Sequence, residues 1–366
     1  MDMLKTAKTY ILAALTAASA LLAFTSCESL YDEEGDCTVK YMLKFRYDMN
    51  LKWADAFPSE VHSVNLYVFD GEGVFVKEYT ARGEALAQPD YRMRLDLPAG
   101  DYRLVAWCGL ENGDGTEAGA DVEKSFIVPQ PEPGVTTIEE LTCTLNTEAT
   151  AADPACSDTQ LDFLFHGYME VSLPDTQDGK EYVYTMPLVK DTNHIRIILQ
   201  QLSGDDMAAD DYDIRIEAAN GAMGYDNALI DSRMVTYRPW AQTTAQAGVG
   251  KDDTDSTRAV IYVEGVVADF SVGRMMAAQH KDMMLTIVNR KSEESIIARV
   301  PIIEYALLSK EYYEMAYGHA MSDQEFMDRE DEYVLTFFLD RNGRWLDASI
   351  LIHSWRIVLH EYGLGS

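Results

Sequence analysis

Residues 39–48 read VKYMLKFRYD, and an apolar side chain stands at every second position: Val39, Tyr41, Leu43, Phe45 and Tyr47. A period of two is typical of a β-strand that buries one face and exposes the other. This stretch therefore predicts a half-buried strand, and the same signal recurs along most of the chain that follows.

Further strand signals and turn sequences follow in the first part of the chain. Residues 64–79 form two strand-like runs on either side of Asp-Gly-Glu-Gly at 70–73, whose glycines suit the positive φ angles of a hairpin. Residues 92–107 predict a second hairpin around Pro-Ala-Gly-Asp at 98–101. Shorter strand-like runs lie at 125–128 and 141–145. About seven strands at this spacing indicate a β-sandwich.

Two segments interrupt the strand pattern. Residues 129–134 carry three prolines, each of which would remove a hydrogen-bond donor from a sheet, so a loop is expected there. Residues 147–160 are rich in Thr, Ala, Asp and Pro and poor in large apolar side chains, as in an interdomain linker. A chain of 366 residues suits two domains. We therefore expect one β-sandwich over 38–146 and another over 161–366.

The second predicted domain also consists mainly of strands. They are expected at residues 168–173, 181–188, 195–199, 214–218, 259–270, 284–289 and 295–300. Between 303 and 329 apolar side chains recur at steps of three and four, which predicts a helical insertion. The Asn342-Gly343 pair, between runs at 333–339 and 345–359, is a strong hairpin signal. The expected fold is all-β, with two tandem β-sandwiches and a short helical insertion in the second.

Residues 1–26 have the pattern of a bacterial lipoprotein signal peptide. Lys5 and Lys8 precede an apolar run over 10–24 that is too short to span a bilayer well. The run ends in Phe-Thr-Ser-Cys, which resembles the lipobox whose cysteine becomes the diacylated first residue of the mature protein. Cys27 is therefore the expected lipidation site. A plain signal peptide cleaved near residues 19–23 is the alternative.

Residues 27–37 form an acidic run that is expected to be a solvated tether. Acidic tracts directly after a lipidated cysteine resemble the export signals of surface lipoproteins in Bacteroidetes, which implies a place on the outer face of the outer membrane. Four cysteines remain beyond Cys27, and an even number in an exported chain permits disulfides, with three full pairings: Cys37, Cys108, Cys143 and Cys156.

The charge of the chain excludes one class of partner. It carries 61 Asp and Glu against 30 Lys and Arg, a net charge of -31 with a pI near 4.4. Such a charge repels phosphate backbones, so no nucleic-acid partner is expected. Hydrophobic residues make up 47% and charged residues 25%, close to globular averages, so the acidity belongs to a folded protein.

We find no sequence motif for catalysis, a metal or a cofactor. The seven histidines are scattered and form no zinc-binding pair. Residues 245–252 depart from a phosphate-binding loop at its first glycine and after its lysine, so a plain loop is expected at 247–252. Asp252, Asp253 and Asp255 lack the glycine and glutamate of an EF-hand, and no Gly-x-Ser-x-Gly occurs. The chain is therefore not expected to be an enzyme.

A set of short motifs spans nearly the whole mature chain. They are FRYDMN at 45–50, ADAF at 54–57, LYVFD at 66–70, LPAGDYRLVAW at 97–107, LFHG at 164–167, KDTNHIR at 190–196, the run 324–333, FFLD at 337–340 and ILIHSW at 350–355. Together, and in this order, they resemble the FimB-like fimbrial anchor family of Bacteroidales. The one departure is Phe165, where a bulkier Trp is expected before His-Gly.

The resemblance implies two transthyretin-like β-sandwiches and a lipid-anchored subunit at the base of a type V fimbria. Such a subunit attaches the shaft pilins to the outer membrane and limits the length of the fimbria. In shaft pilins of this class an arginine-specific protease removes the first strand, and a neighbour's extended segment fills the groove by strand addition. An anchor held by Cys27 would keep its first strand, residues 39–48, because cleavage at Arg46 would cut the tether.

Two alternatives stay open at this point. The last strand either completes the second sandwich or is donated to a neighbour; the side chains on one of its faces are Leu351, His353, Trp355, Ile357 and Leu359. The other function considered is a surface glycan-binding lipoprotein with exposed tryptophans as platforms. Trp107 and Trp355 lie in apolar strands and are expected in the core, which leaves Trp53, Trp240 and Trp345. An exported hydrolase has no motif to support it.

Overall fold

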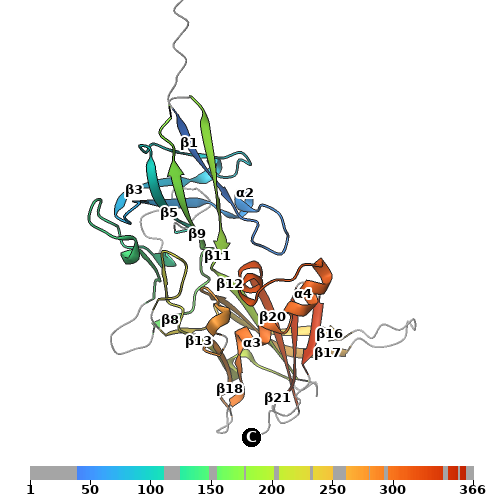
Figure 1. Ribbon diagram of the computed structural model, residues 1–366. Coiled ribbons are helices and arrows are strands. Elements are labelled where there is room, and N and C mark those ends of the chain that lie inside the picture. Colours follow the sequence, from blue (N-terminus) through green and yellow to red (C-terminus); the bar gives the residue numbers. More distant parts are fainter. Residues whose placement is uncertain are drawn as a thin grey trace, which may run out of the picture.

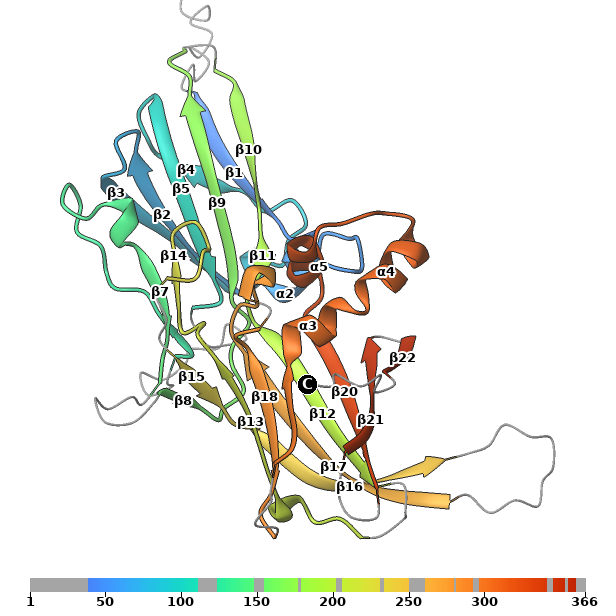
Figure 2. The same ribbon diagram turned by 60° about the horizontal axis from the view of Figure 1, so that its bottom comes forward.

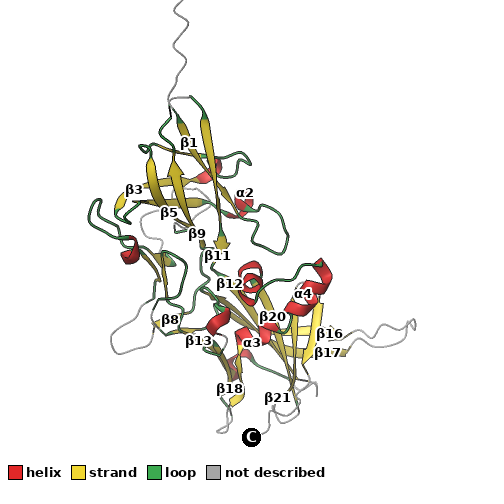
Figure 3. Cartoon of the chain, viewed as in Figure 1, coloured by secondary structure: helices red, strands yellow, loops and turns green. Residues whose placement is uncertain are grey.

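The protein is built mainly from β-strands, and its longest helices follow one another in the second half of the chain (Figure 3). The computed structural model describes residues 39–110, 124–147, 155–176, 179–201, 206–230, 234–249, 261–279, 281–291, 296–340, 345–352 and 355–359. The prediction of an all-β fold with a helical insertion is confirmed.

Two sheets form the first sandwich, at the end of the molecule where the chain begins (Figure 1). One has the order β10-β1-β4, with β1 Lys40–Arg46, β4 Met93–Leu95 and β10 Glu181–Pro187. The other has the order β11-β9-β5-β2-β3, with β2 Ser63–Asp70, β3 Phe75–Arg82, β5 Gly100–Cys108, β9 Phe165–Leu173 and β11 Val189–Lys190. The apolar side chains of β1 point between these two sheets.

Two larger sheets form the other half of the molecule. The first has the order β16-β17-β12-β20-β21-β22, with β12 Asn193–Gln201, β16 Ala241–Val249, β17 Ile261–Val272, β20 Glu332–Leu339, β21 Trp345–Ile352 and β22 Trp355–Leu359. The second has the order β19-β18-β13-β15-β8, with β8 Ala155–Ser157, β13 Tyr212–Ala218, β15 Val235–Tyr237, β18 Met284–Asn289 and β19 Ile296–Pro301.

A small fifth sheet and short helical turns complete the part of the chain that the structure describes. The sheet has the order β14-β7-β6, with β6 Phe126–Ile127, β7 Thr142–Leu145 and β14 Ala222–Gly224. The short helices are α2 Phe57–Glu60 and the 3-10 turns η1 Gly83–Ala85, η2 Ile138–Glu140, η3 Ala209–Asp211 and η4 Ala277–Gln279. The predicted loop at 129–134 is confirmed.

The five-stranded sheet β11-β9-β5-β2-β3 contributes side chains to two hydrophobic cores, one on each of its faces. Alternate side chains of β2 and β5 enter different cores, which explains why β2 is buried along almost its whole length. Leu66 and Leu104 join the core between the sheets of the first sandwich. Tyr67 and Trp107 join the larger core that continues through β7 into the second sandwich. A strand covered on both faces loses its alternation, because both sets of side chains leave water.

The prediction of a hairpin over 92–107 is wrong. Strand β4 pairs with β1, whereas β5 pairs with β2 and β9, so the chain crosses from one sheet to the other at the 98–99 corner. Pro98 and Gly100 indicate a turn, but a turn sequence does not say which sheet the next strand will join.

The predicted domain boundary near residue 161 does not match the sheets. Strands β9, β10 and β11 follow it, yet β9 pairs with β5 and β10 pairs with β1 in the first sandwich, where green β9 lies beside β5 in Figure 1. The predicted linker also contains β8, which pairs with β15. The two sandwiches therefore interleave in sequence, and the linker composition did not mark a division between them.

The helical insertion lies between β19 and β20. It comprises α3 Ile302–Leu307, α4 Lys310–Tyr317 and α5 Asp323–Arg329. Gly318 ends α4 in the left-handed conformation at φ 66°, and the Ser322 side chain caps α5 by accepting a hydrogen bond from the Glu325 backbone. The 3–4 residue period therefore predicted both the position and the class of this element.

The C-terminal hairpin is also confirmed, since β20 and β21 pair antiparallel. The single strand predicted over 345–359 is divided into β21 and β22, which pair with each other inside the same sheet. The loop predicted at 247–252 is wrong for residues 247–249, which belong to β16. The rest of that loop, with Asp252, Asp253 and Asp255, lies outside the described residues.

Candidate functional site

The first strand, β1, occupies the centre of its sheet. It pairs in parallel with β10 along its whole length, from Lys40 opposite Glu181 to Arg46 opposite Pro187. On its other side β1 pairs antiparallel with β4 over three residues. β1 is therefore an inner strand, with hydrogen-bonded neighbours on both sides.

Aromatic side chains fill the groove under β1. Leu43 and Phe45 are no more than 1% exposed. The Phe45 ring stacks on Phe57 at 5.6 Å, and Tyr47 meets the edge of Phe165 at 5.0 Å. Burial of such side chains contributes roughly 1.5–3 kcal/mol each. Removing the strand would therefore expose a deep apolar groove.

Side chains from the loop after β1 fix its C-terminal end. One carboxylate oxygen of Asp55 accepts hydrogen bonds from the backbone N–H groups of Tyr47 (3.0 Å) and Phe57 (3.2 Å). The Asn50 amide donates to the carbonyls of Tyr47 and Ala54. These bonds satisfy the backbone where the ladder ends, so the strand cannot fray from this side without breaking them.

The helical insertion of the second sandwich contacts the loop that follows β1. Arg329, at the end of α5, donates to the carbonyl oxygens of Asp48 (3.1 Å) and Asn50 (3.4 Å). Its guanidinium lies 4.1 Å from the Trp53 ring centroid and pairs with Glu325 at 3.0 Å. Figure 2 shows α5 beside α2 and this loop. We call this set of contacts the Arg329 latch.

A second contact between the sandwiches lies beside the latch. Lys190 of β11 forms ion pairs with Glu60 of α2 and with Asp331, which follows α5. The Lys190 side chain is 6% exposed, and its ammonium lies 3.6 Å from the centroid of the Phe163 ring. Glu60 and Asp331 are partly exposed, but the Lys190 ammonium is buried between them, so these two charge-assisted bonds link α2 to the end of the insertion.

A buried charge cluster completes the junction. Arg274 pairs with Asp191 at 2.7 Å and with Asp328 of α5 at 3.2 Å. Asn227 donates a further hydrogen bond to Asp191, which has no exposed surface. Burial raises the pKa of both carboxyl groups, and Arg274 opposes that shift. Removal of Arg274 would leave two buried acids without their cation.

Glu330 lies next to the latch and is 1% exposed. Burial raises its pKa to about 8, against hydrogen bonds from the Glu332 backbone and the Tyr313 hydroxyl, each at 2.9 Å. Burial also raises the pKa of Tyr47, at the end of β1, and the nearby acids Asp331, Glu60 and Glu330 add to that shift. Burial and the nearby carboxylates therefore both disfavour the ionised forms of Glu330 and Tyr47.

The lipidation site predicted from the sequence, Cys27, lies outside the described residues, as do the signal peptide, the tether and Cys37. Cys108 and Cys143 are buried free thiols, and Cys156 is also free. Disulfides among these three cysteines are therefore absent. Burial raises the pKa of the Cys108 thiol, as expected for an inert core cysteine.

The tryptophans take different roles. Trp107 is fully buried, as predicted. Trp53 is 41% exposed, but one face is covered by Arg329 and its edge by His319, so it belongs to the latch. Trp240 is 36% exposed and Trp345 packs on the core. The side chain of Trp355 lies outside the described residues.

Over the part of the chain that the structure describes, His, Cys, Asp and Glu side chains form no group that could hold a metal ion. Within the same residues, every helix is too short or too polar to cross a membrane. The ring of the buried His166 donates an Nε2–H hydrogen bond to the Tyr225 carbonyl oxygen at 2.8 Å, and burial lowers the pKa of His166 to about 4. It therefore stays neutral and structural.

Sequence reasoning missed the latch. The motifs quoted above contain Asn50, Asp55 and Arg329, but only as letters of a pattern. Asn and Asp directly after a strand do indicate side chain to backbone hydrogen bonds. The residues around Arg329 carry no signal that would predict its hydrogen bond to the Asp48 carbonyl, because the two residues are 281 positions apart in the sequence.

The family model for the fimbrillin-A associated anchor proteins Mfa1 and Mfa2 matches residues 33–361. No curated protein matches the chain. Among solved structures, a putative adhesin from Bacteroides thetaiotaomicron is 30% identical, with 87% of this chain and 97% of that chain covered and a TM-score of 0.71.

Two further solved structures share the fold. A putative polysaccharide binding protein from Bacteroides thetaiotaomicron is 26% identical, with 88% and 99% of the two chains covered and a TM-score of 0.69. The fimbrial anchor protein Mfa2 from Porphyromonas gingivalis is 15% identical, with 88% and 99% covered and a TM-score of 0.60. The chain therefore shares its overall fold with these proteins.

Proposed function

This chain belongs to the family of fimbrillin-A associated anchor proteins, and from that premise we propose that it is the lipid-anchored subunit at the base of a fimbria. In this role it attaches shaft pilins to the outer membrane and limits the length of the shaft. The observation that carries the proposal is β1, which fills its own groove and is held at its far end by the Arg329 latch.

A filled groove suits an anchor and not a shaft subunit. Cys27 precedes the described chain by 12 residues, a length that reaches at most about 40 Å when extended. Tension on the lipid would act along β1, and the ladders to β10 and β4 would carry it together with the latch. Cleavage at Arg46 would disconnect the lipid from the rest of the protein.

The shaft would attach by strand addition at a free sheet edge. Strand β16 is an edge of the six-stranded sheet, and residues 241–249 contain no charged side chain. Edge strands that must not pair with other chains usually carry charges or prolines. β22 forms the other edge and pairs with β21 in its own sheet, which favours the view that the last strand completes the second sandwich.

Mass spectrometry of protein extracted from outer membranes tests the anchor. The expected mature N-terminus is a diacylated Cys27 with the Arg46–Tyr47 bond intact, on a surface that an external protease can reach. Cys27→Ala should release the protein and its bound shaft into the medium, whereas the control Cys37→Ala should not. A lipid-free N-terminus, or cleavage after Arg46 in assembled fimbriae, would contradict the proposal.

Hydrogen exchange tests the attachment mode. Adding the purified shaft pilin should slow the exchange of backbone amides in residues 241–249, because an added strand accepts their hydrogen bonds. Unchanged exchange in β16 with slowed exchange in β1 would show that the shaft enters the first groove instead.

A further inference from the structure

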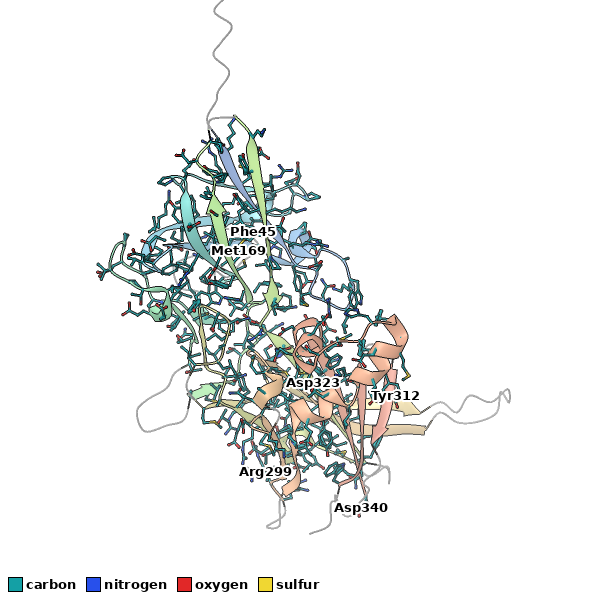
Figure 4. All side chains as sticks on the ribbon, viewed as in Figure 1. Phe45, Met169, Arg299, Tyr312, Asp323 and Asp340 are labelled. Carbon is teal, nitrogen blue, oxygen red and sulfur yellow. The ribbon has the colours of Figure 1, made fainter. Side chains whose placement is uncertain are left out.

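Large exposed apolar side chains gather on the helical insertion. Met315 is 72% exposed, Leu308 48% and Tyr312 43%. Tyr317, at the end of α4, is 48% exposed but stacks on Tyr313 and lies beside Trp53, with ring centroids 6.1 Å apart, so it faces the latch and not this surface. Figure 4 shows Tyr312 on α4 at the margin of the molecule.

These side chains share one face of a helix. Leu308, Tyr312 and Met315 are spaced by four and three residues, and Leu308 and Ser309 keep α-helical angles between α3 and α4. The opposite face already serves the core, because Tyr313 is 3% exposed and packs against Phe326 at 5.4 Å. A surface helix needs one apolar face, so the second one is unexplained by folding.

The charges around this face are acidic and unpaired. Glu304 and Glu311 are exposed, lie seven residues apart on the same side, and form no ion pair with a residue that the structure describes. Lys310, next to Glu311 in the chain, forms its ion pairs with Asp323 and Glu314, and Glu311 acts on it only through its charge. An apolar stripe flanked by free carboxylates is complementary to a segment with apolar side chains beside lysine or arginine.

We propose that Leu308, Tyr312 and Met315, flanked by Glu304 and Glu311, form the docking surface for a shaft pilin segment of that chemistry. The inference rests on the proposed function and goes further, because it assigns specificity. Strand addition uses backbone groups that every chain has, so discrimination between pilins needs side chains. A second copy of this chain is a poor occupant, since its net charge of -31 would meet the same carboxylates.

The experiment measures the affinity of the full-length mature protein for the purified shaft pilin. Met315→Asn and Leu308→Asn should each weaken binding about tenfold or more, as for buried anchors at the centre of an interface. The matched control is Val135→Asn, which changes a 67% exposed apolar side chain in the loop between β6 and β7 and should bind as the wild type does. Equal melting temperatures would show that every variant is folded.

The charged residues give an independent readout. The double variant Glu304→Lys and Glu311→Lys should bind about tenfold more weakly in low salt, and the salt dependence of the wild type should shrink or reverse. Sedimentation of the protein alone should give a monomer. A dimer that Met315→Asn dissociates would overturn the inference in favour of self-association.

The outcomes separate this inference from the proposed function. If the wild type binds the pilin and the Leu308 and Met315 variants bind equally well, the docking surface is wrong and the anchor role stands. If the wild type does not bind any shaft pilin of its own fimbria, both are wrong. Tenfold losses of affinity in the Leu308 and Met315 variants, with Val135→Asn unchanged, support both.

Discussion

Strand β1 and helix α4 both carry large apolar side chains, but those of β1 are buried and several of those of α4 are exposed to solvent. Phe45 of β1 is 1% exposed, whereas Met315 of α4 is 72% exposed. Both elements touch the Arg329 latch, β1 through the loop that follows it and α4 through Tyr317 and Trp53. Apolar surface that the protein keeps covered holds the fold together, and apolar surface that it leaves open is available to a partner.

The largest expected effect on stability is that of a substitution in the buried face of β1. Phe45→Ala should lower the free energy of unfolding by about 3–5 kcal/mol, because it leaves a cavity beside Phe57 between two sheets. Chemical denaturation measures the change. Met42→Ala, on the half-buried opposite face of β1, is the control and should cost less than half as much. Equal costs would mean that β1 does not fill the groove tightly.

The second expected effect is a pH dependence at the junction. The pKa of Glu330 is about 8 in the folded protein and near 4.5 when unfolded, so between these values the folded state binds the extra proton. Stability from this group is therefore lost as pH rises from about 4.5 to 8. At 1.36 kcal/mol per pKa unit the loss is bounded at about 5 kcal/mol, and relaxation should reduce it to about 3 kcal/mol.

The difference between wild type and Glu330→Gln isolates that contribution. The Gln variant should become the more stable of the two as pH rises to 8.5, in thermal unfolding followed across pH. Both proteins contain His166, so its contribution cancels in the difference. Because the pKa of His166 is lowered to about 4, this residue alone would make the folded protein more stable as pH rises from about 4 to 6.5. A constant difference across pH would show that Glu330 is ionised in the folded protein.

The latch gives the third effect. Arg329→Gln removes two hydrogen bonds to carbonyls, the pair with Glu325 and the stacking on Trp53, and should cost about 2 kcal/mol. Amides of residues 47–57 should exchange faster with solvent, and trypsin should cut after Lys52 sooner. The control Arg238→Gln breaks an exposed ion pair with Asp213 and should change stability by less than about 1 kcal/mol. Unchanged exchange in 47–57 would mean that the latch does not hold β1.

The smallest effect on stability is expected for a substitution in the exposed apolar face of α4. Met315→Asn should change the free energy of unfolding by no more than about 0.5 kcal/mol, since the side chain already lies in water. Denaturation under the conditions used for Phe45→Ala provides the direct contrast. A loss above about 2 kcal/mol would place α4 among the core elements and not on a surface for partners.

The sequence alone determined the local elements of this protein. Alternation over 39–48 gave β1, the three- and four-residue steps of 303–329 gave the insertion, and Asn342-Gly343 gave the last hairpin. Each of these signals comes from side chains within a few residues of one another, so the periodicity and the turn chemistry suffice. The ordered set of motifs also indicated the anchor family that the comparison then identified.

Only the tertiary structure decided which strands meet and what holds β1. Strand β10 joins β1 across about 140 residues, Lys190 reaches Glu60 across 130, and Arg329 reaches Asp48 across 281. Strand pairing uses backbone groups that are alike in every strand, so the choice of partner depends on how both faces are buried once the chain is folded. The outward face of α4 is likewise visible only after Tyr313 has taken its place in the core.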